Sequence, residues 1–215
     1  MRIIRLRFTK TGEAAYISHL DLQRVMARSL RRSGLPVWFS QGFNPHIYLS
    51  FALPLPLMQE SLVEAVDFKT ESEDDNFENY IGALNDALPK GIDATAVEPP
   101  KHVAGDIAYA EYLLFYDAPK ADMQVWAECY EALQEANVIR RTKRSEQVEN
   151  LKEHLPALLI DEEHNAFRVI LPAGNPLNIN PELLTDFLQS SAVNAAAPVR
   201  TLRWQVYTNE YDVFV

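Results

Sequence analysis

The sequence predicts an α+β fold made of two tandem ferredoxin-like units, each with the order βαββαβ and an antiparallel sheet. Segments with strand-like and helical periodicity follow this order through residues 1–100, and the same order returns in residues 106–215. The proline-rich stretch at 99–106 has the composition of a linker. A chain of 215 residues with 47% hydrophobic content is long enough for two such domains, and a single larger α+β domain is the structural alternative.

The first strand is predicted from the alternation of residues 2–8. Ile4, Leu6 and Phe8 share one face, which we expect to be the core face. Arg5 and Arg7 then lie on the opposite face, which carries no helix in a ferredoxin-like unit and can bind RNA or a neighbour.

The first helix is predicted at residues 19–33. Ser18 is a good N-cap residue, and Asp21 lies three positions later, near the positive end of the helix dipole. Gly34 supplies the left-handed residue that ends the helix, and Pro36 prevents its continuation. Four arginines share an arc of roughly 100° on this helix; they are Arg24, Arg28, Arg31 and Arg32.

The remaining elements follow from the same two periodicities and from the positions of proline and glycine. Two prolines exclude residues 53–57 from a central strand. We expect further strands at residues 37–40, 47–53, 62–69, 92–97, 109–117, 138–142, 166–171 and 199–207. We expect further helices at residues 75–88 and 122–136, and after an N-cap at Asn180. Residues 145–160 are compatible with a loop, a strand or a short helix.

Positive charge is concentrated at the start of an acidic chain. The formal net charge is −10, but residues 1–50 contain eight basic and two acidic residues and therefore carry +6. The overall charge argues against non-specific affinity for nucleic acid or anionic membranes. The local charge predicts a partner site near the N-terminus, and the alternative is a solvated helix face together with two arginines at a strand edge.

Two regions combine basic groups with groups that can contact bases. The loop at 41–46 adds amide, aromatic and imidazole side chains to the arginines of the first helix, and a second basic cluster follows at 140–144. Arginines would hold phosphates while Phe43 and the amides contact bases or ribose hydroxyls. The residues that we expect to bind nucleic acid are Arg5, Arg7, Arg24, Arg28, Arg31, Arg32, Gln41, Phe43, Asn44, His46, Arg140, Arg141, Lys143 and Arg144.

No complete catalytic motif is present in the sequence. His19, His46 and Tyr16 are candidates for general acid and base in metal-independent RNA cleavage. The five histidines are scattered, and a single cysteine, Cys129, leaves no zinc-binding pattern. The chain has seven glycines and no Gly-x-Gly pair, so a phosphate-binding loop is not expected. We therefore expect no metal and no cofactor.

Four motifs of the N-terminal region resemble the signature of the radical-SAM-linked proteins. They are YISHLDL at 16–22, LRRSGLP at 30–36, SQGFNPH at 40–46 and SFALPLP at 50–56. Residues 140–144 and 178–184 are also reminiscent of this family, which is a domain of unknown function fused to or associated with radical SAM proteins. The resemblance implies a radical SAM protein as a partner. The chain itself lacks the CxxxCxxC motif that binds the iron-sulfur cluster of a radical SAM enzyme.

Together, these features predict a non-catalytic accessory protein that binds structured RNA and works with a radical SAM or RNA-processing partner. One alternative is an interaction module that docks on a radical SAM enzyme without contacting RNA. The other is a metal-independent endoribonuclease-like enzyme. One cysteine, no signal peptide and no long apolar span predict a cytoplasmic protein that does not associate with membranes.

Overall fold

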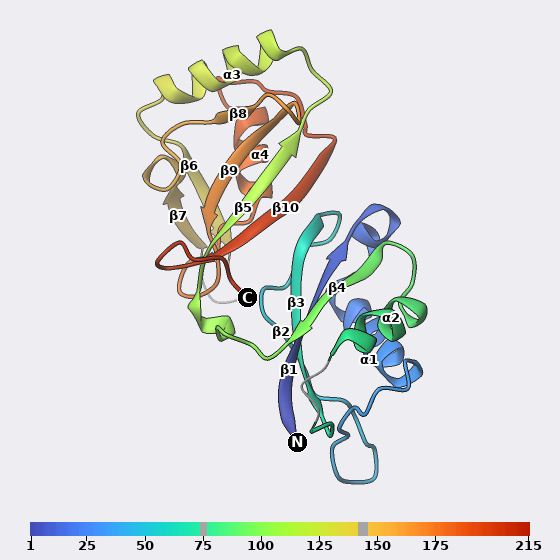
Figure 1. The fold of residues 1–215 in the computed structure, drawn as a ribbon. Helices are drawn as coiled ribbons and strands as arrows, with labels where there is room; N and C mark the ends of the chain where they lie inside the picture. Colours follow the sequence, from blue (N-terminus) through green and yellow to red (C-terminus); the bar gives the residue numbers. More distant parts are fainter. Residues whose placement is uncertain (74–76, 142–145) are drawn as a thin grey trace. The chain divides into compact units, whose positions relative to one another are not determined.

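The computed structural model describes residues 1–73, 77–141 and 146–215, which form two compact units (Figure 1). The first unit is Met1–Ile107 together with Val213–Val215, and the second is Ala108–Asp212. The described residues contain four α-helices and mostly antiparallel strands, so the α+β class is confirmed. The assignment of residues 1–100 and 106–215 to separate folding domains stays a prediction.

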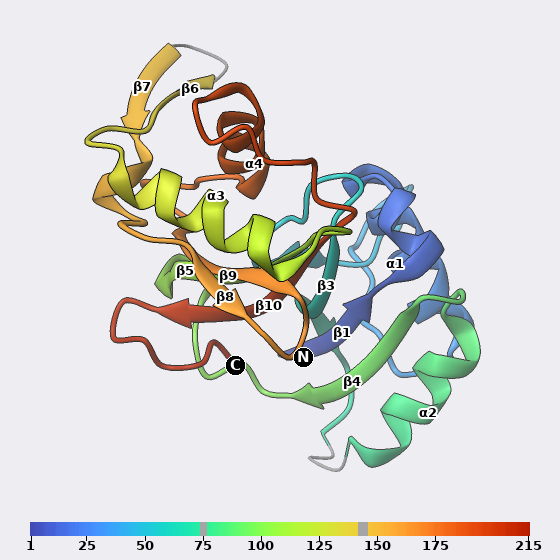
Figure 2. The ribbon, with the colours of Figure 1, turned by 90° about the horizontal axis from the view of Figure 1, so that it is seen from above.

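The sheet of the first unit is antiparallel and has the strand order β4-β1-β3-β2 in its described part. Its strands are β1 (Arg2–Lys10), β2 (Leu49–Phe51), β3 (Glu60–Thr70) and β4 (Ile92–Glu98). The helices α1 (His19–Arg32) and α2 (Glu78–Ala87) lie together on one face of this sheet (Figure 2). Short 3-10 helices occur at Gly12–Tyr16 and Ala104–Asp106.

The first unit is held together by the faces that the sequence patterns predict. Ile4, Leu6 and Phe8 are fully buried from β1, and Leu22 and Met26 pack against them from α1. These contacts fix the orientation of α1, so the side of α1 opposite Leu22 and Met26 faces the solvent. Burial of apolar surface contributes about 25 cal/mol per Å² to stability.

The start of α1 is confirmed at the residue predicted. The Ser18 side chain accepts a hydrogen bond from the Asp21 backbone N–H, and its hydroxyl donates to the Asp21 carboxylate at 2.8 Å. The Ser18 oxygen provides an acceptor for a backbone N–H that has no partner within the helix. The negative charge of Asp21 interacts favourably with the positive end of the helix dipole. Gly34 follows the helix with φ +72°, as the predicted helix end requires.

The strand predicted at 37–40 is wrong. The segment makes two isolated bridges, from Val37 to Thr70 and from Phe39 to Ile47, and the next strand, β2, covers three residues. The chain reverses direction after Ser40, because the Ser40 N–H donates to the His46 carbonyl oxygen. The segment is therefore a tight loop with two anchor points, which holds residues 41–46 at the surface.

The sheet of the second unit has the order β10-β5-β9-β8, and a separate hairpin is formed by β6 and β7. The strands are β5 (Ile107–Phe115), β6 (Asn137–Arg141), β7 (Glu146–Asn150), β8 (Leu159–Asp161), β9 (Ala166–Pro172) and β10 (Arg200–Thr208). The helices are α3 (Lys120–Ala132) and α4 (Pro181–Ser190), with a 3-10 helix at Leu151–Glu153. The ambiguous stretch at 145–160 thus contains a strand, a helical turn and a further strand in its described part.

The two helices of the second unit lie on one face of its sheet (Figure 2). Tyr130 of α3 and Phe187 of α4 meet edge to face, with 6.4 Å between ring centroids. The Tyr130 hydroxyl donates to the Leu155 carbonyl oxygen at 2.8 Å, and burial raises the pKa of this phenol. Among the described residues, no helix is both long and apolar enough to span a bilayer.

Candidate nucleic-acid interface

Three arginines of α1 lie on one exposed side of the helix and differ in their local contacts. Arg24 Nη1 lies 2.8 Å from Asp21 Oδ1 in an exposed ion pair. Hydrogen bonds from Ser18 and then from Arg24 lower the pKa of Asp21. Arg31 lies over the Phe39 ring, 5.5 Å from its centroid, and Arg28 has no hydrogen bond or ion pair within the described part of the chain. An exposed ion pair such as that of Arg24 is weak enough to be exchanged for a phosphate.

Arg32 takes a different position from the other arginines of the helix. Its Nη2 donates to the Ala87 carbonyl oxygen at 2.6 Å, and the Ser29 hydroxyl donates to the same oxygen at 3.0 Å. Ala87 is the last residue of α2, where carbonyl groups have no partner within the helix. Arg32 therefore joins the ends of α1 and α2.

A groove of about 380 Å³ lies between α1 and the segment that leads into β2. Arg24 and His46 both line it, although 22 positions of sequence separate them. Its full lining is Leu20, Gln23, Arg24, Ala27, His46, Ile47, Tyr48 and Leu49. The structure thus brings the arginine helix and the end of the 41–46 loop into one site.

His46 is held in a fixed orientation by Ser40. The Ser40 Oγ accepts the His46 backbone N–H at 3.0 Å and lies 2.7 Å from the ring Nδ1. A hydroxyl has one proton to donate, so Ser40 can also donate to an unprotonated Nδ1. Nε2 is then the ring nitrogen that remains for a ligand in the groove.

The other predicted groups of this loop lie at the surface. Gln41, Asn44 and Phe43 are exposed, and Phe43 is fully so. A fully exposed phenylalanine offers a ring face on which a base can stack.

The expectation that Arg5 is available to a partner is wrong. Its side chain is 0% exposed and makes two hydrogen bonds to Asp67, Nε to Oδ1 at 2.7 Å and Nη2 to Oδ2 at 2.9 Å. Its guanidinium also lies 4.5 Å from the centroid of the Phe214 ring. Asp67 is directly opposite Arg5 in the β1–β3 register, a pairing that the alternation of β1 alone could not reveal. Arg7 is 37% exposed and lies 3.2 Å from Glu98.

The three candidates for acid-base catalysis, His19, His46 and Tyr16, do not line the same groove. His46 lines the groove, whereas Tyr16 is exposed on the turn before α1. His19 Nε2 lies 3.0 Å from the Gln23 amide nitrogen, and its ring packs edge-on against Phe51. Within the described residues, no group of three or more His, Cys, Asp and Glu side chains could hold a metal ion.

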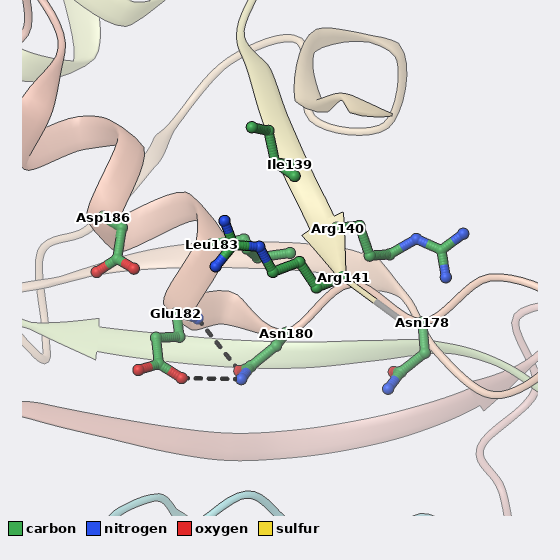
Figure 3. Close-up of a pocket in the computed structure, with 8 residues that line it drawn as sticks. All are labelled: Ile139, Arg140, Arg141, Asn178, Asn180, Glu182, Leu183 and Asp186. Carbon is green, nitrogen blue, oxygen red and sulfur yellow. Dashed lines mark hydrogen bonds between the residues drawn. The ribbon is translucent and has the colours of Figure 1, made fainter. Parts of the chain in front are cut away.

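A second groove, of about 600 Å³, lies in the second unit between the end of β6 and α4 (Figure 3). The segments around 140 and around 180, which the sequence patterns single out separately, meet here. The lining residues are Ile139, Arg140, Arg141, Asn178, Asn180, Glu182, Leu183 and Asp186. Lys143 and Arg144 lie outside the described residues. The acidic and amide residues of this groove do not belong to a basic cluster and have no charge pattern of their own, although the Asn180 cap predicts the helix that carries Glu182 and Asp186.

Residues 3–181 match the model of a family described as an uncharacterized protein conserved in bacteria (DUF2344). No curated protein matches the chain. The family match includes the whole lining of the first groove and ends at the first residue of α4, so it takes in part of the second groove. Because the match covers well over half of the sequence, the chain belongs to this family of uncharacterized conserved bacterial proteins.

Proposed function

We propose that this protein binds structured RNA through the exposed side of α1 and the adjoining 41–46 loop, as a non-catalytic accessory protein. The observation that carries the proposal is the groove that joins Arg24 to His46, with Arg28 and Arg31 on the same side of the helix. Arg24 and Arg31 are seven positions apart, with Arg28 between them, which corresponds to about 10 Å along the helix. That length allows three guanidinium groups to follow a phosphate backbone.

The chemistry of the loop complements these cations. Exposed Gln41 and Asn44 amides can donate to and accept from base edges, while the Phe43 ring can stack on an unpaired base. The charge of +6 in residues 1–50 attracts a polyanion to this side, and the remaining acidic surface repels it. RNA would thus approach the first unit in a preferred orientation.

We infer further that each unit is ferredoxin-like. The orders β4-β1-β3-β2 and β10-β5-β9-β8, each with two helices on one face, support this description. The β6–β7 hairpin would then be an insertion in the second unit. In a ferredoxin-like unit the helices form a single layer on the sheet. The side of α1 that faces away from the sheet is therefore accessible to a ligand.

A radical SAM or RNA-processing protein is the partner that we propose, acting in the cytoplasm. The support for a radical SAM partner is the resemblance of the four N-terminal motifs to the radical-SAM-linked proteins. Two of those motifs supply the end of α1 and the 41–46 loop. A protein that docks without RNA could use the same surface, and its binding would survive nuclease treatment.

The test compares RNA affinity in two charge-reversed variants of the full chain. We expect Arg24→Glu/Arg28→Glu/Arg31→Glu to bind a structured RNA at least about tenfold more weakly than the parent, because three phosphate contacts are lost. The control, Lys90→Glu/Lys101→Glu/Lys120→Glu, changes the net charge equally at exposed positions outside α1. Filter binding measures both. If the α1 variant binds as tightly as the control, the proposal is wrong, and a protein partner that survives nuclease treatment would favour docking.

A further inference from the structure

Two walls of opposite charge face each other across the groove of the second unit. Arg140 and Arg141 lie on one wall, at the end of β6, and leave it in opposite directions (Figure 3). Glu182 and Asp186 lie on the other wall, one helical turn apart on the same side of α4. In the described part of the chain, no ion pair joins the arginines to these two carboxylates. The groove therefore keeps both a cationic and an anionic wall.

The arginines are positioned by the neighbouring strand. Arg140 Nη2 donates to Gln147 Oε1, and Arg141 Nε lies 2.9 Å from Glu146 Oε1. Arg140 Nε is buried without a hydrogen-bond partner among the described residues. A buried donor of this kind costs free energy unless a ligand supplies an acceptor.

On the α4 wall, the Asp186 carboxylate is more available to a ligand than the Glu182 carboxylate. It has no hydrogen bond or ion pair within the described residues, whereas Glu182 Oε2 accepts from Asn180 Nδ2 at 3.1 Å. An ionised carboxylate only accepts hydrogen bonds, and its two oxygens can accept two parallel donors. Asp186 can thus accept two adjacent N–H groups of one ligand.

Each wall of the groove also carries an apolar side chain. Ile139 is 54% exposed on β6, and Leu183 is half-buried on α4. Both line the groove, so a flat ring with apolar faces could rest against them. The volume of about 600 Å³ falls in the range of small-molecule sites and accommodates a nucleotide.

Guanine is the base whose edge fits this arrangement. Its N1–H and N2–H groups are adjacent donors that match the two oxygens of one carboxylate. Adenine, cytosine and uracil each place an acceptor beside a donor on the same edge, and that acceptor would face the carboxylate. A phosphate on the other end of the nucleotide would meet Arg141, whose side chain extends from β6 toward α4 (Figure 3).

We propose that this groove binds a guanine nucleotide of a single RNA strand, with Asp186 reading the base and Arg141 holding the phosphate. The inference rests on the proposed RNA binding and gives it a base preference. The first unit would provide general affinity for the RNA backbone. The second would select where on the strand the protein is placed.

Mononucleotides test the groove without using the surface of the first unit. The four 5′-nucleoside monophosphates are titrated into the full, isotope-labelled chain, and dissociation constants are taken from backbone amide shifts of residues that line the groove. We expect GMP to bind about tenfold more tightly than AMP, CMP or UMP. Asp186→Asn should abolish this difference because an amide presents one donor in place of an acceptor. Glu131→Gln, an exposed change on α3, is the matched control and should keep the preference.

The spectra also report whether each variant folds, because amides far from α4 should not move. Equal affinity for all four nucleotides, or a GMP preference that survives Asp186→Asn, would overturn the inference. Neither result would bear on RNA binding by α1, which the charge-reversed variants test separately. Conversely, a GMP preference in a protein whose RNA affinity does not depend on α1 would contradict the proposed function and support the groove.

Discussion

At the scale of single residues, the arginines of this chain do different work according to what lies beside them. Arg5 is buried against Asp67 and the Phe214 ring, Arg32 caps α2, and Arg28 has no partner in the described structure. The sequence predicts that α1 carries an arginine stripe because helical spacing is local. It does not predict which arginines are already engaged, because Asp67 and Ala87 approach from distant parts of the chain.

The buried pair of Arg5 and Asp67 should be important for stability. Asp67→Ala leaves the guanidinium group buried without a countercharge, so we expect the free energy of unfolding to fall by about 3 kcal/mol. Urea denaturation measures this change. Asp93→Ala, which removes an exposed carboxylate from β4, should change stability by less than about 0.5 kcal/mol.

A double variant sharpens this prediction. Arg5→Met/Asp67→Leu replaces both charges by apolar groups of similar size and should recover most of the loss caused by Asp67→Ala. A single Asp67→Ala variant that is as stable as Asp93→Ala would show that Arg5 does not depend on Asp67.

At the scale of elements, local sequence signals predict where helices begin, but contacts with distant parts of the chain determine whether a short segment forms a strand. Ser18 and Asn180 cap α1 and α4 as predicted, because each side chain acts on its own first turn. Residues 37–40 depend on bridges to Thr70 and Ile47, and the alternation of four residues is too little to reveal this. The position of β6 beside α4 depends on contacts about 40 residues apart. The second groove was therefore not predictable as a site.

The edge strand β8 is joined to its sheet by an ion-pair network. Arg168 of β9 donates to Asp161 of β8 at 2.7 Å and to Glu111 of β5 at 2.6 Å. The hydrogen bond from Arg168, with a smaller effect of His164, lowers the pKa of Asp161 well below its ordinary value. Burial and then the hydrogen bond to Glu111 raise the pKa of Tyr207 to about 12, so that phenol stays a donor at neutral pH.

This network predicts a pH-dependent effect of Asp161→Asn. A carboxyl group whose pKa is lower in the folded state stabilises the protein above its unfolded pKa, about 3.9, and loses that effect as the pH falls toward the folded pKa. Because Arg168 is partly exposed, we expect the variant to be about 1 kcal/mol less stable at pH 6. The difference should shrink steadily below about pH 4.

Urea denaturation at several pH values between neutral and strongly acidic conditions measures this trend. Asp117→Asn, an exposed change just after β5, is the control and should give a small difference throughout. A difference for Asp161→Asn that stays constant as the solution is acidified would contradict the assigned role of Arg168.

At the scale of the whole molecule, the chain combines a basic N-terminal region with an acidic remainder. Residues 1–50 carry +6 in a protein of net charge −10, and this contrast was visible in the sequence. What the sequence could not show is that Arg24 and His46 line one groove while Arg5 is removed from the surface. The candidate surface is consequently smaller than the set of basic residues, and it is defined by α1 and the loop at 41–46.

The salt dependence of RNA binding is the most direct test of this account. In filter binding of a structured RNA from about 50 to 200 mM KCl, the logarithm of the parent's binding constant should fall linearly with the logarithm of salt concentration. Arg28→Gln/Arg31→Gln should reduce the slope by about 2, and Lys90→Gln/Lys101→Gln should leave it unchanged. Equal slopes in all three proteins, or binding that does not respond to salt, would contradict RNA recognition by α1.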